Sequence, residues 1–181
     1  MIKIKDYEVK NTVEELTVSE FEKVAAIQQD MGLDHFEKQI SVFTTLGVPE
    51  DIFDDMEIRE FKGYVKAFND VQPKEYEFLA EVEIEGFVYK AFDEEFKTSV
   101  RDLKHIESKV KSSPTSYMAF MLAVIFKRTD LTKAEHYDNA HLKHKTELFG
   151  KLPAAIAVPY VTHIGNELSN ALKDESTEEL G

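Results

Sequence analysis

The chain has 181 residues, of which 43% are hydrophobic and 31% are charged, and its formal net charge is −13. This hydrophobic fraction is enough to build a core, which excludes an intrinsically disordered acidic chain. The 35 acidic residues outnumber the 22 basic ones. A protein that neutralises nucleic-acid phosphates normally has the opposite balance, so we expect no direct nucleic-acid binding.

The chain contains no cysteine. Disulfides, thiolate zinc sites and thiol nucleophiles are therefore excluded, which fits a reducing cytosol. The first ten residues, MIKIKDYEVK, alternate in charge and lack the apolar region of a signal peptide. No window reaches the roughly 18–20 apolar residues that a membrane-spanning helix needs. We expect a cytoplasmic protein without a membrane segment.

Residues 2–9 alternate as two very short strands, with a turn at residues 5–6. The apolar spacing then changes to that of a helix, which Thr17 or Ser19 would cap and Gly32 would end.

The chain continues as two more helices in the first half. Asp34 is placed to cap the first of them, and Gly47 is placed to close it. Residues 50–56 predict a short acidic helical turn after a proline. Residues 58–68 predict a further helix that ends before Pro73.

The second half opens with the clearest hairpin pattern, residues 76–92, in which Glu85 and Gly86 form a two-residue turn. An amphipathic helix carries apolar residues from Val100 to Val110, and SSPTS (112–116) breaks it.

The apolar run 117–126 predicts a central buried helix, with Pro114 in its first turn. A loop (127–134) and a mixed helix from about Glu135 to Gly150 follow. A last helix then begins at residue 152.

The ten residues 152–161, LPAAIAVPYV, carry no charge. Pro153 fits the first turn of the last helix, where its missing N–H costs nothing. Pro159 would remove a hydrogen bond to the carbonyl of Ala155 and kink that helix. We expect a bent, buried helix start that lies against the central helix.

The two halves align at an offset of 80 residues. The identities pair Ile4, Lys10, Glu14, Glu15 and Ser19 with Ile84, Lys90, Glu94, Glu95 and Ser99. This indicates an internal duplication of a hairpin-plus-helices unit, and coincidence between two generic α+β patterns is the alternative. We predict a mostly helical α+β fold with an N-terminal unit (1–70), a C-terminal unit (74–172) and an acidic tail (173–181).

The sequence indicates no catalytic residues, metal ligands or cofactor site. His136, His141 and His144 lie on one predicted helix, but they form neither HExxH nor another zinc-ligand spacing. Nucleophile motifs and glycine-rich phosphate loops do not occur in the sequence. Paired acids such as Glu14 and Glu15 point in different directions and predict solvated faces.

The remaining signal is apolar surface in the second half. Our candidate partner-binding residues are Met118, Met121, Ile125, Phe126, Leu148, Phe149, Leu152, Ile156 and Tyr160. Two interpretations stay open: these side chains close the core, or part of them lines a groove for another chain. Methionines would suit an adaptable binding surface.

Several segments together resemble the tail assembly chaperones of tailed bacteriophages and the related baseplate-hub assembly proteins. They are EIEGFVYKAFDEEF (83–96), AFMLAVIFKR (119–128) and EHYDNAHLKHKTELFGKLPAAIAVPYVTHIGNEL (135–168) in the second half, and EELTVSEFEKVAAI (14–27) and FEKQISVFTTLGVPEDIFDDMEIREFKGYV (36–65) in the first. The likeness is one of spacing and residue type over most of residues 2–172. The acidic tail after Leu172 has no place in the family pattern.

The resemblance implies a non-enzymatic protein that binds a tape-measure or tail-hub protein in the host cytoplasm during assembly, without cofactors. Self-association into a homo-oligomer is left open. Two rival functions remain: a structural virion subunit of the tail, baseplate or neck, and an acidic DNA mimic that inhibits a host nucleic-acid enzyme. A DNA mimic needs acids arrayed on one face, whereas the acids here are spread along most of the chain.

Overall fold

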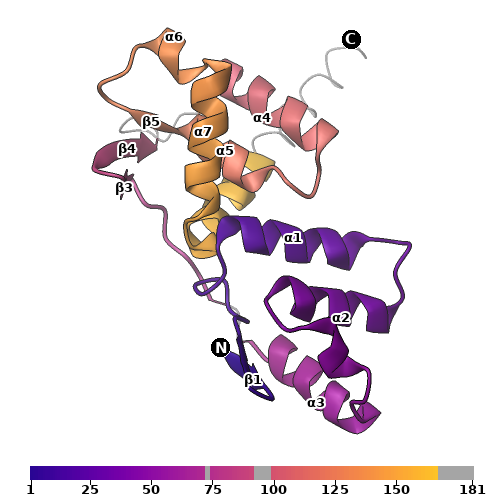
Figure 1. The fold of residues 1–181 in the computed structure, drawn as a ribbon. Coiled ribbons are helices and arrows are strands. Elements are labelled where there is room, and N and C mark those ends of the chain that lie inside the picture. The colour runs from indigo at the N-terminus through magenta and orange to yellow at the C-terminus, as the bar shows by residue number, and fades with distance from the viewer. Residues whose placement is uncertain (72–73, 92–98, 167–181) are drawn as a thin grey trace.

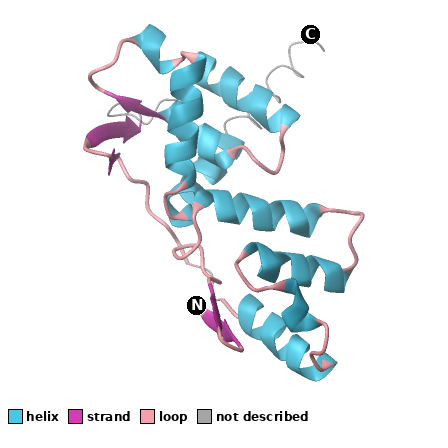
Figure 2. Cartoon of the chain, viewed as in Figure 1, coloured by secondary structure: helices cyan, strands magenta, loops and turns pink. Residues whose placement is uncertain are grey.

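The computed structural model describes residues 1–71, 74–91 and 99–166. They form a mostly helical α+β fold with a two-stranded hairpin and a three-stranded antiparallel sheet, which confirms the expected fold class. Figure 1 shows two groups of elements along the chain, and Figure 2 shows that helices predominate in both. The predicted acidic tail (173–181) lies outside the described residues.

The first group begins with β1 (Ile2–Ile4) and β2 (Tyr7–Val9), which pair antiparallel around a tight turn. α1 (Val18–Gln29), α2 (His35–Thr45), the 3₁₀ turn η1 (Glu50–Phe53) and α3 (Ile58–Asn69) follow. These are the elements that the sequence predicts for the first half. Six buried apolar side chains of this group form one cluster: Ile4, Val9, Phe43, Val48, Phe53 and Phe61.

Local signals explain where these helices begin and end. Thr17 accepts a hydrogen bond from the backbone N–H of Glu20, and the Glu20 carboxylate accepts the N–H of Thr17 in return. Asp34 and Glu37 form the same capping box at α2. Gly47 follows α2 with φ +102°, a conformation that glycine adopts without strain.

The second group contains a sheet of β3 (Glu81–Ile84), β4 (Phe87–Ala91) and β5 (Phe126–Arg128), in the order β3-β4-β5. The turn at Glu85 and Gly86 is as predicted. The third strand is a correction, because the sequence predicts residue 126 as helix and the residues after it as loop. Phe126 leaves the helix to pair with Ala91, and Arg128 pairs with Tyr89.

The helices of this group are α4 (Val100–Ser112), α5 (Met118–Ile125), α6 (Lys133–His136) and α7 (Asn139–Gly150). Two predictions are wrong in detail. Pro114 lies in the turn before α5 and not in its first helical turn. The single helix predicted over 135–150 is two helices, because the Asp138 side chain caps α7 by accepting the N–H of His141.

The helix predicted from residue 152 also differs from the structure. Pro153 precedes a 3₁₀ turn, η2 (Ala154–Ile156), and helical structure runs from 157 to 166. Pro159 therefore lies in the first turn of that helix, where no internal hydrogen bond requires its N–H. The predicted kink at Pro159 is wrong, because the helix begins at residue 157 and Pro159 is not in its interior.

The stretch does lie against α5, as predicted. Ala157, Tyr160 and Ile164 belong to the same buried cluster as the apolar residues of α5. Figure 1 shows α5 and α7 side by side at the centre of this group.

Helix α1 connects the two groups (Figure 1). Its first residue, Val18, belongs to the C-terminal cluster, and its N–H donates to the carbonyl of Leu152 at 2.8 Å. Ala154 donates in turn to the carbonyl of Leu16 at 2.8 Å. The start of α1 is therefore held by the residues that follow α7.

The two hairpins match at the predicted offset of 80 residues. Their turns begin at Lys5 and Glu85, which have φ +50° and +53°. Strand β5 has no counterpart in residues 1–71, and the identities at Glu94 and Glu95 lie outside the described residues. The duplication of a larger unit stays a prediction.

Candidate functional site

The structure places most of the predicted partner-binding residues inside the C-terminal core. Six of the nine are at most 5% exposed: Met121, Ile125, Phe126, Leu148, Phe149 and Tyr160. The other three, Met118, Leu152 and Ile156, are half-buried. The rings of Phe126, Phe149 and Tyr160 pack at centroid distances of 5.3 Å. A partner cannot contact the six buried side chains without opening this core.

An open groove lies beside Tyr160, between the segment that precedes β3 and the last helix. Its volume is about 470 Å³, and its lining includes Tyr76, Phe78, Val158, Pro159, Thr162 and His163. The Phe78 ring packs edge-on against Tyr160 at 5.0 Å, yet 42% of Phe78 stays exposed. The groove thus has a mixed lining, in which aromatic side chains stand beside the polar and charged side chains of Lys74, Glu75 and Asn166.

The hydroxyl of Tyr160 fixes one wall of this groove. It donates a hydrogen bond to the carbonyl of Leu79, and burial raises the pKa of Tyr160 to about 12. The phenol therefore stays protonated and remains a donor at physiological pH. This contact holds the extended segment against the last helix.

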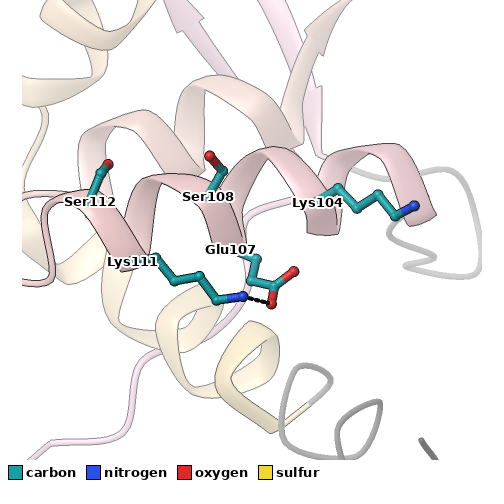
Figure 3. A pocket seen from close by; sticks show the side chains of 5 residues that line it. All are labelled: Lys104, Glu107, Ser108, Lys111 and Ser112. Atoms are coloured by element: carbon teal, nitrogen blue, oxygen red, sulfur yellow. Dashed lines mark ion pairs between the residues drawn. The ribbon is translucent and has the colours of Figure 1, made fainter.

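A second hollow, of about 600 Å³, lies along α4 (Figure 3). Its five lining residues all come from that one helix, and Lys111 pairs with Glu107 at 2.6 Å. Figure 3 shows the Ser108 and Ser112 hydroxyls pointing away from this ion pair. One solvated helix face cannot enclose a ligand, so we interpret this hollow as ordinary surface.

The most elaborate polar contacts centre on Asp102, which is 3% exposed in the first turn of α4. Its carboxylate accepts hydrogen bonds from Lys127 Nζ at 2.7 Å and from the Tyr137 hydroxyl at 2.6 Å. The Ser99 hydroxyl donates a third, at 2.7 Å. Burial alone would raise the pKa of Asp102, but these three donors outweigh it and hold the pKa below its ordinary value.

The Tyr137 ring extends this cluster towards the outer side of α4. The Arg101 guanidinium lies 3.9 Å from the ring centroid, and the His105 ring stacks on Tyr137 at 5.2 Å. Arg101 is exposed, so this cation–π contact is of the weaker, solvated kind. Together these contacts attach the break between α6 and α7 to α4.

Lys145 on α7 lies close to this network but outside its hydrogen bonds. It is 1% exposed, and its Nζ has no hydrogen-bond partner. Burial, followed by the positive charge of Lys127, lowers the pKa of Lys145 to about 7. Burial and the charge of Lys145 likewise lower the pKa values of His136 and His141. Three basic side chains thus influence one another in the interior of an acidic protein, and each is shifted towards its neutral form.

Comparison with protein-family models, with curated proteins and with solved structures finds no match to this chain.

Among residues 1–71, 74–91 and 99–166, no three or more His, Asp or Glu side chains are grouped as metal ligands would be. The three histidines of the predicted single helix lie on two helices, His136 on α6 and His141 and His144 on α7. In the same described ranges, no helix has the length and apolar character that crossing a membrane requires.

Sequence reasoning missed Lys145, because it interpreted residues 134–147 as a solvated helix face. A usable signal was present in the helical spacing. Lys145 lies three residues from both Leu142 and Leu148, which are buried on α7. A lysine between two core positions at that spacing faces the core itself.

Proposed function

We propose that this protein is a non-enzymatic assembly factor of a bacteriophage tail or baseplate. In this proposal it binds a tape-measure or tail-hub protein in the host cytoplasm, in the manner of a chaperone. The observation that carries the proposal is the groove between the segment before β3 and the last helix. One wall of the groove, from Val158 to Asn166, belongs to residues 135–168, one of the segments that resemble tail assembly chaperones.

The lining of the groove fits a protein segment as its occupant. Interface anchors are mostly aromatic or apolar side chains that fill pockets on the partner. The exposed Phe78 and the half-buried Val158 offer a complementary surface, and about 470 Å³ accommodates a few side chains. An acidic protein of net charge −13 attracts basic partners. We therefore expect a segment with apolar side chains flanked by lysine or arginine.

The six buried candidate residues have a different role in this proposal. Met121, Phe126 and Phe149 form the core on which the last helix rests. In this proposal they pack against the buried side of the last helix and do not contact the partner. The sequence predicted a contact surface on the apolar faces of α5 and α7. The contact surface that we propose is instead the outer side of residues 157–166.

The experiment co-expresses the chain with the tape-measure and tail-hub proteins of the same phage and measures how much of each is recovered soluble and bound. Thr162→Arg places a long cationic side chain in the groove without touching the core, since Thr162 is exposed. Thr44→Arg makes the same change at an exposed position of α2 and serves as the matched control.

We expect the wild type and Thr44→Arg to recover the partner and Thr162→Arg to recover several-fold less. Recovery of neither tail protein by the wild type would overturn the proposed function. Equal recovery by both variants would retain the function and reject the groove as the contact. Mass spectrometry of purified particles separates the structural-subunit alternative, because a chaperone is absent or sparse there.

A further inference from the structure

Basic side chains converge on Lys145 from several elements. His141 lies on the same helix, α7, and His136 lies on α6. Lys127 and Arg128 come from β5, and the positive charges of both act on Lys145. The Tyr89 ring forms part of the surroundings, with its centroid 5.8 Å from Lys145 Nζ.

Three nitrogen atoms of this basic cluster (Lys127, Arg128, His136, His141 and Lys145) are buried without hydrogen-bond partners. They are Lys145 Nζ, His136 Nδ1 and His141 Nε2. Lys145 and His136 are 1% and 9% exposed, so both are at least nine-tenths buried. Buried polar atoms are nearly always hydrogen-bonded, and three exceptions within one cluster call for an explanation.

The carboxylates near the basic cluster are already engaged elsewhere. Asp102 accepts three side-chain donors, of which Lys127 is one. Asp130 pairs with the guanidinium of Arg128, and it is exposed. Glu135 accepts the backbone N–H of Thr132 at 2.7 Å. Asp138 caps α7. These carboxylates leave the positive charge of Lys145 and the two imidazoles without a direct hydrogen-bonded counter-charge.

We propose that the basic cluster is a binding site for a small oxyanion, with Lys145 as its central ligand and His136 and His141 as additional donors. The Lys145 ammonium group offers only donors, each neutral imidazole offers one N–H donor, and an oxyanion offers only acceptors. The negative charge of the anion would also favour protonation of the two imidazoles. A carboxylate or phosphate group would accept the N–H groups of Lys145 and supply the counter-charge that this buried ammonium lacks. The inference does not depend on the proposed assembly function.

The basic cluster reaches solvent on the β5 side. The side chain of Lys127 is 34% exposed, and that of Arg128 is 16% exposed. Lys127 is paired with Asp102 and Arg128 with Asp130, so the positive charge that lacks a direct partner lies deeper, at Lys145. Because Lys145 is almost fully buried, the site favours a small ion or a single terminal group over an extended ligand.

Inorganic phosphate and acetate are the two probes, each added to the purified full chain at constant ionic strength with chloride as the balancing salt. Thermal unfolding reports binding as a rise in Tm. A rise that saturates with concentration indicates a site, whereas a general salt effect continues to increase. The imidazole resonances of His136 and His141 provide a second readout at the cluster itself.

Lys145→Met is the test variant, and Lys143→Met is the matched control on the exposed side of the same helix. We expect a saturable Tm rise in the wild type and in Lys143→Met, and none in Lys145→Met. The variant is judged by its anion-dependent shift, so a change in its basal Tm does not obscure the result.

The anion that raises the Tm identifies the class of ligand. A response to phosphate alone assigns a phosphate site, and a response to acetate assigns a carboxylate site, which a partner side chain can also supply. Absence of a saturable shift with both anions in the wild type would overturn the proposal. An equal shift in Lys145→Met would do the same.

Discussion

The carboxylate of Glu22 on α1 accepts the backbone N–H of Met118, the first residue of α5. The same oxygen also accepts the N–H of Ala119 at 3.3 Å. Helix α5 has no capping side chain of its own, because Tyr117 makes no such hydrogen bond. A residue 96 positions away in sequence thus satisfies the donors that a helix start leaves free. It also attaches α1 to the central helix of the C-terminal group.

Replacing Glu22 by alanine should therefore destabilise the protein. Two N–H groups at the start of α5 would lose their acceptor, and losses of this kind cost about 1–2 kcal/mol. Burial raises the pKa of Glu22, so part of the benefit is offset at neutral pH by the cost of burying a charge. Glu22→Gln keeps an acceptor oxygen without that charge, and it should lose clearly less.

Urea unfolding of the three proteins at pH 7 measures these differences as changes in the free energy of unfolding. If alanine and glutamine variants lose the same amount, the capping role of Glu22 is wrong.

The contact between Ser19 on α1 and Gly150 at the end of α7 gives a second prediction. A Cβ atom added at Gly150 would lie 2.4 Å from the Ser19 hydroxyl oxygen. Gly150→Ala should therefore lose about 1 kcal/mol, because Ser19 must rotate or the helices must separate. In a Ser19→Ala background the clash is gone, and the greater helix propensity of alanine should recover most of the loss.

Thermal and urea unfolding of the four proteins in this double-mutant cycle give the coupling between the two positions. Additive effects of the two substitutions would show that the contact does not limit the approach of α1 to α7. The same cycle is a check on the packing of the N-terminal helix against the C-terminal group.

The Asp102 cluster gives a prediction that depends on pH. Tyr137→Phe removes one donor to a buried carboxylate, and we expect a loss of about 1.5–3 kcal/mol at pH 7. The pKa of Asp102 is lower in the folded chain than its ordinary value of 3.8. The stabilisation that ionised Asp102 contributes is therefore fully present above pH 3.8. It is lost as the pH falls through the lower pKa that Asp102 has in the folded chain.

The free energies of unfolding of the wild type and Tyr137→Phe should accordingly converge at acid pH. Asp130→Ala is the control, because Asp130 is exposed and its pairing with Arg128 is a surface contact that should change little. A gap between wild type and Tyr137→Phe that is unchanged down to the acid transition would contradict the assigned role of Asp102.

Local sequence signals were sufficient to predict most elements of this fold. Thr17 and Asp34 mark helix starts because their side chains cap the next turn, a contact within three residues. Gly86 marks a hairpin for an equally local reason, its φ of +79°. These signals do not depend on the rest of the chain.

The predictions that failed involve contacts between distant segments. Phe126 continues an apolar run, and only its pairing with Ala91 makes it a strand. The start of the last helix is shifted because residues 152–155 bind the backbone of residues 13–18. The apolar side chains of α5 could equally have lined a groove, and only the packing of Tyr160 and α7 against them shows a closed core. Sequence periodicity cannot distinguish a buried face from an open one.

Lys145 gives the last prediction, in a buffer without phosphate or carboxylate. Its pKa is about 7 in the folded chain and near its ordinary value of 10.5 in the unfolded chain. Between these values the unfolded state binds more protons, so stability should rise with pH, by up to about 1.4 kcal/mol per unit. His136 and His141 add nothing to this slope above pH 7, because their pKa values are lowered. Free energies of unfolding determined between pH 7 and pH 9 measure this slope.

Lys145→Met should flatten this slope and make the protein more stable at pH 7, by about 1–4 kcal/mol. A packed apolar side chain avoids the cost of burying a charge that has no hydrogen-bonded partner. Lys143→Met should keep the slope of the wild type, since Lys143 is exposed. If the wild type shows no rise between pH 7 and 9, Lys145 is better solvated than its 1% exposure indicates. If Lys145→Met is instead less stable at pH 7, the ammonium group makes favourable contacts that outweigh its burial.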